Sequence, residues 1–185
     1  QEAGSILREL SKREKQACEE LSQLKAGNKA YPKNLENARA YIKRRLLEEC
    51  RRSVEVHVLS DLLDIRNDEW RNAVEGYLAG SKLSLVVAPA YAKTAMEIYG
   101  ELDRREYWNV AVLDTEKASK AAPPIFENAL SKEVEVRENY LRPFIDMLLG
   151  KVIKCRGIEE LRKNRTGITP DCMLYRNYRL QYINP

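Results

Sequence analysis

Two carboxylates, Asp114 and Glu116, are the residues of this sequence best placed to do chemistry, because they follow the apolar run VAVL. An acidic pair at the end of a buried strand can hold Mg²⁺ beside a nucleotide phosphate. Such a site also needs a glycine-rich phosphate loop, and the run LAGSKLS lacks the spacing and the strand-before, helix-after context. We therefore interpret the pair as an ordinary strand end. A small nucleotide- or metal-dependent α/β enzyme with this acidic strand-end site is the alternative.

The other reactive side chains form no recognisable catalytic or metal-binding pattern. The four cysteines, at positions 18, 50, 155 and 172, include no CxxC pair, and His57 is the only histidine. These counts argue against a tetrahedral zinc site and against a redox dithiol. No G-x-S-x-G or HExxH motif is present either. We expect no catalytic residue, no metal and no cofactor in this chain.

The charge balance gives no strong overall attraction for nucleic acid, since 32 basic residues face 28 acidic ones and the net charge is +4. Local clusters of basic residues could still bind DNA weakly, independently of its sequence and with strong salt dependence. The alternative is that these side chains are solvated helix faces next to acidic neighbours such as Glu48 and Glu49. The candidate DNA-binding residues are Arg44, Arg45, Arg51, Arg52, Lys151, Lys154 and Arg156.

No stretch of the sequence predicts a membrane span or a secretory leader. The longest apolar run is far below the roughly 20 residues that a spanning helix needs. The first residues, QEAGSILREL, contain no signal-peptide hydrophobic core. We expect a cytoplasmic location, and the missing initiator methionine suggests a piece of a longer protein.

The N-terminal third is patterned as helix. Leucine and alanine recur at spacings of three and four residues between positions 7 and 24, which is typical of a coiled-coil seam that tolerates Glu14. An amphipathic helix packed on its own domain is the alternative. Gly27 and Pro32 interrupt the pattern before a second stripe begins at Leu35. We predict a distal coiled-coil arm over residues 1–53, with two helical segments and an elbow near 27–33.

Residues 54–185 alternate strand and helix signals and predict a compact α/β domain. We expect Asn67 or Asp68 to cap a helix with Trp70 on its inner face, and Pro89 to open the next helix. We also expect a long helix from Ser131 that bends at Pro143 and stops at Gly150. The expected strands lie at 54–59, 82–88, 109–114 and 151–155, followed by a hairpin that flanks Arg176-Asn177.

Four runs of this domain resemble the hinge region of MukB-like SMC (structural maintenance of chromosomes) ATPases, including the JetC subunits of bacterial Wadjet anti-plasmid systems. They are LLDIRNDEWRNAVEGYL, KLSLVVAPAYAKTAMEIY, VAVLDTEK and ITPDCMLYRNYRLQYINP, and the resemblance covers about residues 56–185. Its most specific part is W-R-x-A-[IV]-E-x-x-L, where Trp70, Arg71, Ala73, Val74, Glu75 and Leu78 stand in the motif positions.

The resemblance implies a non-enzymatic dimerisation hinge that joins two arms of a DNA-translocating, loop-extruding ATPase in plasmid defence or chromosome organisation. It implies a homodimer, association with the nucleoid or with plasmids, and a returning coiled-coil segment beyond Pro185. ATP, magnesium, a kleisin and accessory subunits would bind head regions outside this chain.

We expect the dimer to form through the C-terminal hairpin, because the hairpin offers more apolar and aromatic surface than one face needs. The alternative is that the hairpin packs only on its own core. The candidate interface residues are Met173, Leu174, Tyr175, Tyr178, Leu180 and Tyr182.

Overall fold

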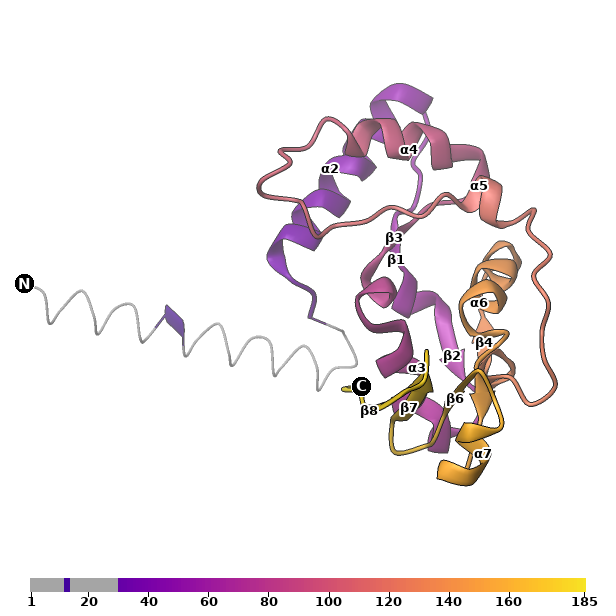
Figure 1. Cartoon of the computed structure of the whole chain (residues 1–185). Helices are drawn as coiled ribbons and strands as arrows, with labels where there is room; N and C mark the ends of the chain where they lie inside the picture. Colours follow the sequence, from indigo (N-terminus) through magenta and orange to yellow (C-terminus); the bar gives the residue numbers. More distant parts are fainter. Residues whose placement is uncertain (1–11, 14–29) are drawn as a thin grey trace, which may run out of the picture.

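The computed structural model describes residues 12–13 and 30–185 of the chain (Figure 1). The predicted heptad seam between positions 7 and 24 lies outside the described residues. In the described part, helices α2 (Lys33–Cys50), α4 (Ala92–Tyr99) and α5 (Thr115–Ala118) and the short strands β1 (His57–Val58) and β3 (Leu85–Val86) lie in one half of the molecule. The other labelled elements lie in the other half (Figure 1).

Helix α2 (Lys33–Cys50) packs inside the domain. It contacts α4 (Ala92–Tyr99), and its buried stripe joins the core that includes Val56 and Ile98. The expectation that the α/β unit begins at residue 54 did not allow for this packing. The stripe has the same spacing whether a helix pairs in a coiled coil or in a core, so the sequence could not separate the two. The stripe consists of Leu35, Ala38, Ile42 and Leu46.

Strands β1 (His57–Val58) and β3 (Leu85–Val86) form a short antiparallel pair. The predicted strand at 109–114 is wrong. Only Val112 forms an isolated parallel bridge to Leu85, and the Leu85 N–H donates to the Ala111 carbonyl at 2.8 Å. An apolar run cannot reveal how many of its backbone groups will find a partner strand.

An internal repeat organises the centre of the fold. The first copy contains η1 (Leu59–Leu62), β2 (Leu63–Ile65), η2 (Asp68–Trp70) and α3 (Arg71–Leu78). The second contains η5 (Leu130–Glu133), β4 (Val134–Val136), η6 (Asn139–Leu141) and α6 (Arg142–Leu149). Every element of the second copy begins 71 positions after its counterpart, as Leu130 follows Leu59.

The two copies meet in a local two-fold arrangement. Strands β2 and β4 pair antiparallel with Asp64 opposite Glu135, which are counterparts in the repeat. Two ion pairs follow the same two-fold symmetry: Arg66 lies 3.4 Å from Glu135, and its counterpart Arg137 lies 3.1 Å from Asp64. Two backbone hydrogen bonds, of 2.8 and 2.9 Å, follow the same symmetry at the two ends of the ladder. The two copies of the repeat are therefore joined across one short β ladder.

The prediction of one long helix from Ser131 is wrong. Its first part is η5, β4 and η6, and helix begins only at Arg142. Pro143 lies in the first turn of α6 and opens that helix instead of bending it. The run Val134-Glu-Val136 forms a strand because β2, remote in sequence, pairs with it.

The local capping predictions are confirmed. The Asn67 side chain accepts from the Glu69 N–H at 3.1 Å, and Pro89 opens the turn before α4. Gly150 follows α6, where an added Cβ would lie 2.3 Å from the Asp146 carbonyl oxygen. Trp70 is buried in the second core with Val74 and other apolar side chains, as predicted.

The C-terminal part is a four-stranded sheet in the order β5-β6-β7-β8. Its strands are β5 (Ile153–Lys154), β6 (Thr166–Ile168), β7 (Met173–Arg176) and β8 (Arg179–Tyr182). Helices α5 (Thr115–Ala118) and α7 (Ile158–Arg162) are short. Strand β6, which follows α7, was not predicted. In the described part of the chain, no helix has the length and apolarity needed to cross a membrane.

Candidate functional site

The C-terminal hairpin presents an apolar face to solvent. Its register places Met173 opposite Tyr182 and Tyr175 opposite Leu180, so these four side chains share one face. Leu174 points to the other face and is buried in the second core. Leu180 and Tyr182 are 46% and 68% exposed. The predicted interface residues therefore divide: Leu174 belongs to the core, whereas Leu180 and Tyr182 of the outward face stay exposed in the described part of the chain.

Strand β8 is an edge of the sheet, since β7 is its only partner among the described strands. All four of its residues are exposed. Hydrogen bonding alternates along an antiparallel strand, and the hairpin closes between Arg176 and Arg179. The backbone groups of Leu180 and Tyr182 therefore face away from β7. They can pair with another strand.

The hairpin tip carries a tyrosine in a conformation that favours glycine. Asn177 and Tyr178 have φ angles of 53° and 62°, as a two-residue hairpin turn of type I′ requires. The Tyr178 side chain is 95% exposed and gains no core packing in return. A bulky residue held at positive φ costs on the order of 1 kcal/mol or more, which makes this residue a candidate for contact with a partner.

The end of the hairpin is anchored on the domain. The Ile183 N–H donates to the Cys172 carbonyl at 2.9 Å. A Cβ added at Gly76 of α3 would lie 2.9 Å from the Asn184 carbonyl oxygen, so the glycine allows the chain to pass close to the helix. This packing holds β8 in a fixed position at the edge of the sheet.

The predicted DNA-binding arginine Arg45 is already neutralised. Its guanidinium contacts Glu48, Glu49 and Glu101 at 2.9 to 3.0 Å. Hydrogen bonds from Arg45 and then from the Tyr41 hydroxyl lower the pKa of Glu101 to about 2. Arg45 is therefore committed to holding α2 against the segment after α4.

Lys154 and Arg156 are also engaged. Lys154 pairs with Glu133 at 2.5 Å, and Arg156 forms a two-pronged ion pair with Glu69. Both cations lie over the Trp70 ring, at 5.8 and 5.4 Å from its centroid. The pair with Arg156 lowers the pKa of the Glu69 carboxyl. These contacts tie β5 to the start of α3 and leave little charge free for a phosphate.

The remaining basic candidates are exposed and lie in two places. Arg51 and Arg52 follow α2, whereas Lys151 precedes β5, which pairs with β6 in the other half of the molecule (Figure 1). Arg44 is exposed and lies 3.9 Å from Glu48. The structure therefore does not bring the seven predicted residues into one surface.

A group of arginines around the hairpin was missed. A cavity of about 370 Å³ is lined by Arg162 and Arg165 together with Tyr175 and Tyr178. Arg176 lies over the Tyr77 ring at 5.6 Å. The signal for it in the sequence is the alternation of arginine and tyrosine in LYRNYRLQY, of which the predicted interface includes only the apolar and aromatic members.

The acidic residues of the alternative enzyme site have structural contacts. The Asp114 carboxylate accepts from the Lys117 N–H at 3.2 Å and caps α5, and Glu116 pairs with Lys120 at 3.8 Å. A cavity of about 460 Å³ beside them is also lined by Lys93 and Lys117. Among the described residues, no group of three or more histidine, cysteine or acidic side chains could hold a metal ion. The observed geometry is that of a helix cap.

Comparison with known proteins identifies the fold. No family model and no curated protein matches the chain. The SMC hinge domain of Geobacillus stearothermophilus, solved as an asymmetric dimer, matches 96% of this chain and 74% of its own, with a TM-score of 0.58 and 19% identity. A Pyrococcus furiosus Smc hinge domain with an extended coiled coil matches 96% of this chain and 65% of its own, with a TM-score of 0.56 and 16% identity.

A second structure of the Pyrococcus furiosus SMC hinge domain matches 80% of this chain and 86% of its own, with a TM-score of 0.54 and 17% identity. The three matches show that the chain has the fold of an SMC hinge domain. The predicted fold class, a compact mixed domain of hinge type, is confirmed.

Proposed function

We propose that this chain is the dimerisation hinge of an SMC-like protein and pairs two copies of itself. The observation that carries the proposal is the likeness of nearly the whole chain to hinge domains, one of which forms a dimer. The outward face and free edge of the C-terminal hairpin support it independently. The chain acts as a binding module in this proposal and not as an enzyme.

The proposed interface is the outward face of the hairpin, with Met173, Tyr175, Leu180 and Tyr182, extended by Tyr178 at the tip. Aromatic residues supply most of the contact area of stable interfaces, and a two-fold arrangement is the commonest way to close one. The backbone groups of β8 that face away from β7 can add a strand-to-strand contact with the partner.

The finer assignment rests on the sequence runs that resemble MukB-like SMC ATPases and JetC. On that basis we propose a role in plasmid defence or chromosome organisation, with weak DNA binding and with nucleoid or plasmid association. ATP, magnesium, a kleisin and accessory subunits would bind head regions outside this chain. Whether a purified full-length protein extrudes DNA loops in an ATP-dependent way is the test of this assignment.

Light scattering on the full chain tests dimerisation. We expect a dimer at micromolar concentration that dissociates in Leu180→Asp and Tyr182→Asp, because each change buries a carboxylate in an apolar contact. Leu47→Asp is the matched control, since Leu47 is 52% exposed on α2, which Figure 1 shows far from the hairpin. Circular dichroism should show that all three variants remain folded.

The coiled-coil signal gives the competing explanation for any dimer. Leu10→Glu with Leu21→Glu removes the predicted seam and should leave a hinge dimer intact. A monomeric wild-type chain would refute the proposal, and so would a dimer that only the seam variant dissociates. A chain that begins at Val54 is unsuitable for this experiment, because it lacks the core residues of α2.

A further inference from the structure

Two cavities of the domain are counterparts under the internal repeat. We name them the Ser60 groove and the Ser131 groove, with volumes of about 700 and 630 Å³. Each is lined by all three residues of its central strand, β2 or β4. Each also contains the equivalent serine and the equivalent first arginine of the following helix, Arg71 or Arg142. The repeat has therefore produced the same groove twice.

The Ser60 groove has one wall made by the polypeptide that leads into α2. The Tyr31 hydroxyl lies 2.9 Å from the Ser60 hydroxyl and donates to the Asp61 carboxylate at 2.6 Å. Because the phenol proton goes to Asp61, its oxygen accepts from Ser60. Glu36 and Arg39 of α2 complete the same wall. This groove shows how the shared architecture holds an incoming polypeptide segment.

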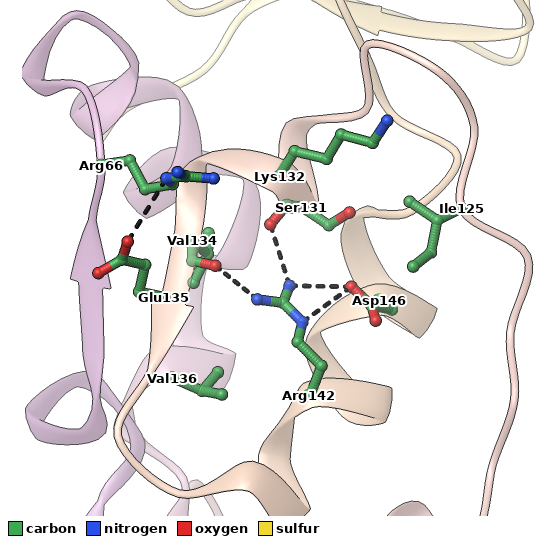
Figure 2. A pocket seen from close by; sticks show the side chains of 9 residues that line it. All are labelled: Arg66, Ile125, Ser131, Lys132, Val134, Glu135, Val136, Arg142 and Asp146. Carbon is green, nitrogen blue, oxygen red and sulfur yellow. Dashed lines mark hydrogen bonds and ion pairs between the residues drawn. The ribbon is translucent and has the colours of Figure 1, made fainter.

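Among the described residues, the Ser131 groove lacks a counterpart to that wall. Of the residues that the structure describes outside the repeat, Ile125 alone lines it (Figure 2). The Ser131 hydroxyl is fully buried and has no hydrogen-bond partner among the described residues. Figure 2 shows this hydroxyl on the side of the cavity that faces Ile125. A buried hydroxyl without a partner is costly, so its position indicates an acceptor or donor supplied by a bound molecule.

The floor of the Ser131 groove is already fixed. The Arg142 guanidinium donates to the carbonyls of Val134 and Ser131 at 2.5 and 2.9 Å and to Asp146 at 2.8 Å (Figure 2). These hydrogen bonds use the N–H groups of Arg142 and the carbonyl groups that they reach, so those groups are not left for an occupant. The groups left to bind an occupant are the Ser131 hydroxyl, the exposed Lys132 ammonium, the Arg66–Glu135 ion pair and the apolar side chains of Val134, Val136 and Ile125. Because Arg66 and Glu135 offset each other, Lys132 supplies the uncompensated charge among the described lining residues.

The residue at one equivalent position has opposite charge in the two grooves, which reverses the charge required of the occupant. Asp61, which accepts the proton of Tyr31, is replaced at the equivalent position by Lys132. A lysine can only donate, so the occupant must present an acceptor to Lys132, and the Ser131 hydroxyl can donate to the same group. A carboxylate on an apolar stem meets this requirement and gains from charge complementarity.

We propose that the Ser131 groove binds an acidic segment of a partner polypeptide, with a glutamate or aspartate carboxylate held between the Ser131 hydroxyl and Lys132. The counterpart groove already holds a polypeptide, which favours a segment of chain over a small molecule. The stem of the acidic side chain lies against Val134 and Ile125. This site lies on β4, whereas the proposed dimer contact lies on β8, so the two proposals stand or fall separately.

The probe is a blocked peptide, acetyl-Leu-Glu-Leu-Glu-Leu-amide, titrated into the ¹⁵N-labelled full chain and followed by NMR. We expect saturable shifts of the backbone amides between Ser131 and Val136. The glutamine version of the peptide should not bind. Lys132→Glu should weaken the affinity by about tenfold or more, because a charge-assisted bond becomes a repulsion. Lys93→Glu, at an exposed position of α4, makes the same change in net charge and should leave the affinity unchanged.

Ser131→Ala should weaken binding without unfolding the chain, and Lys132→Arg should retain it. Absence of saturable shifts at millimolar peptide would overturn the proposal, as would equal effects of Lys132→Glu and Lys93→Glu. Shifts confined to the Ser60 groove would also contradict it. If Lys132→Glu dissociates the dimer in light scattering, the groove belongs to the contact between copies and the proposal of a separate acidic partner is wrong.

Discussion

The paired serines of the repeat allow one prediction to be worked out in detail. Ser60→Ala and Ser131→Ala remove the same hydroxyl from equivalent positions in the two copies of the repeat. The first hydroxyl bonds to Tyr31 at 2.9 Å, and the second is buried without a partner in the described chain. The same chemical change should therefore have opposite effects on the free energy of unfolding.

The magnitudes follow from what each hydroxyl does in the free chain. Losing one neutral, partly buried hydrogen bond lowers the free energy of unfolding by about 0.5–1.5 kcal/mol. Removing a buried hydroxyl without a partner recovers its desolvation cost of about 1–3 kcal/mol, reduced by the small cavity that the oxygen leaves. We expect Ser60→Ala to destabilise by about 1 kcal/mol and Ser131→Ala to stabilise by a similar amount, a separation of about 2 kcal/mol.

Urea unfolding at one fixed protein concentration measures both values, because a self-associating protein gains apparent stability with concentration. Ser119→Ala is the control. Its hydroxyl donates to the Glu116 carbonyl at the surface, so its loss should change the free energy of unfolding by less than about 0.5 kcal/mol. Equal destabilisation by Ser60→Ala and Ser131→Ala would refute the reasoning, because it would mean that Ser131 has a partner of equal value.

Two further predictions concern alkaline pH and DNA. Burial, followed by the hydrogen bond to Asp61, raises the pKa of Tyr31 from 10.0 to about 12, so its contribution to stability is complete below pH 10 and is lost as the pH rises to about 12. Tyr31→Phe should unfold more easily below pH 10, and the difference from wild type in urea titrations should shrink above pH 10; a constant difference would contradict the assignment. Arg51→Glu with Arg52→Glu should weaken low-salt DNA binding in fluorescence anisotropy, whereas Lys154→Gln should change it little because that lysine is paired with Glu133. Equal losses in the two variants would show that the ion pair leaves Lys154 free to bind phosphate.

Local chemistry made the helix boundaries predictable. Asn67, Pro89 and Gly150 act through bonds and steric limits within a few residues, so the sequence alone indicated what they do. Strand β4 was missed because its partner β2 lies 71 positions away. The run Val134-Glu-Val136 acquires its conformation from that pairing.

The candidate interface was predictable only in part. Alternation predicted that successive hairpin residues point to opposite faces, but not which face the domain covers. Only the fold shows that Leu174 points inward and Tyr175 outward. The repeat itself could have been found from the sequence, because Leu-Ser begins both copies and two arginines five residues apart recur in each, at 66 and 71 and at 137 and 142.

The ladder between β2 and β4 has the geometry of an interface between two identical subunits, although both strands belong to one chain. Two identical subunits must change every position together, since one gene encodes both. Halves encoded in tandem mutate independently. One groove can therefore keep Asp61 and hold its own N-terminal segment while the other acquires Lys132 and a different ligand. Duplication within the chain thus permits a division of labour that a symmetric pair of small domains could not evolve.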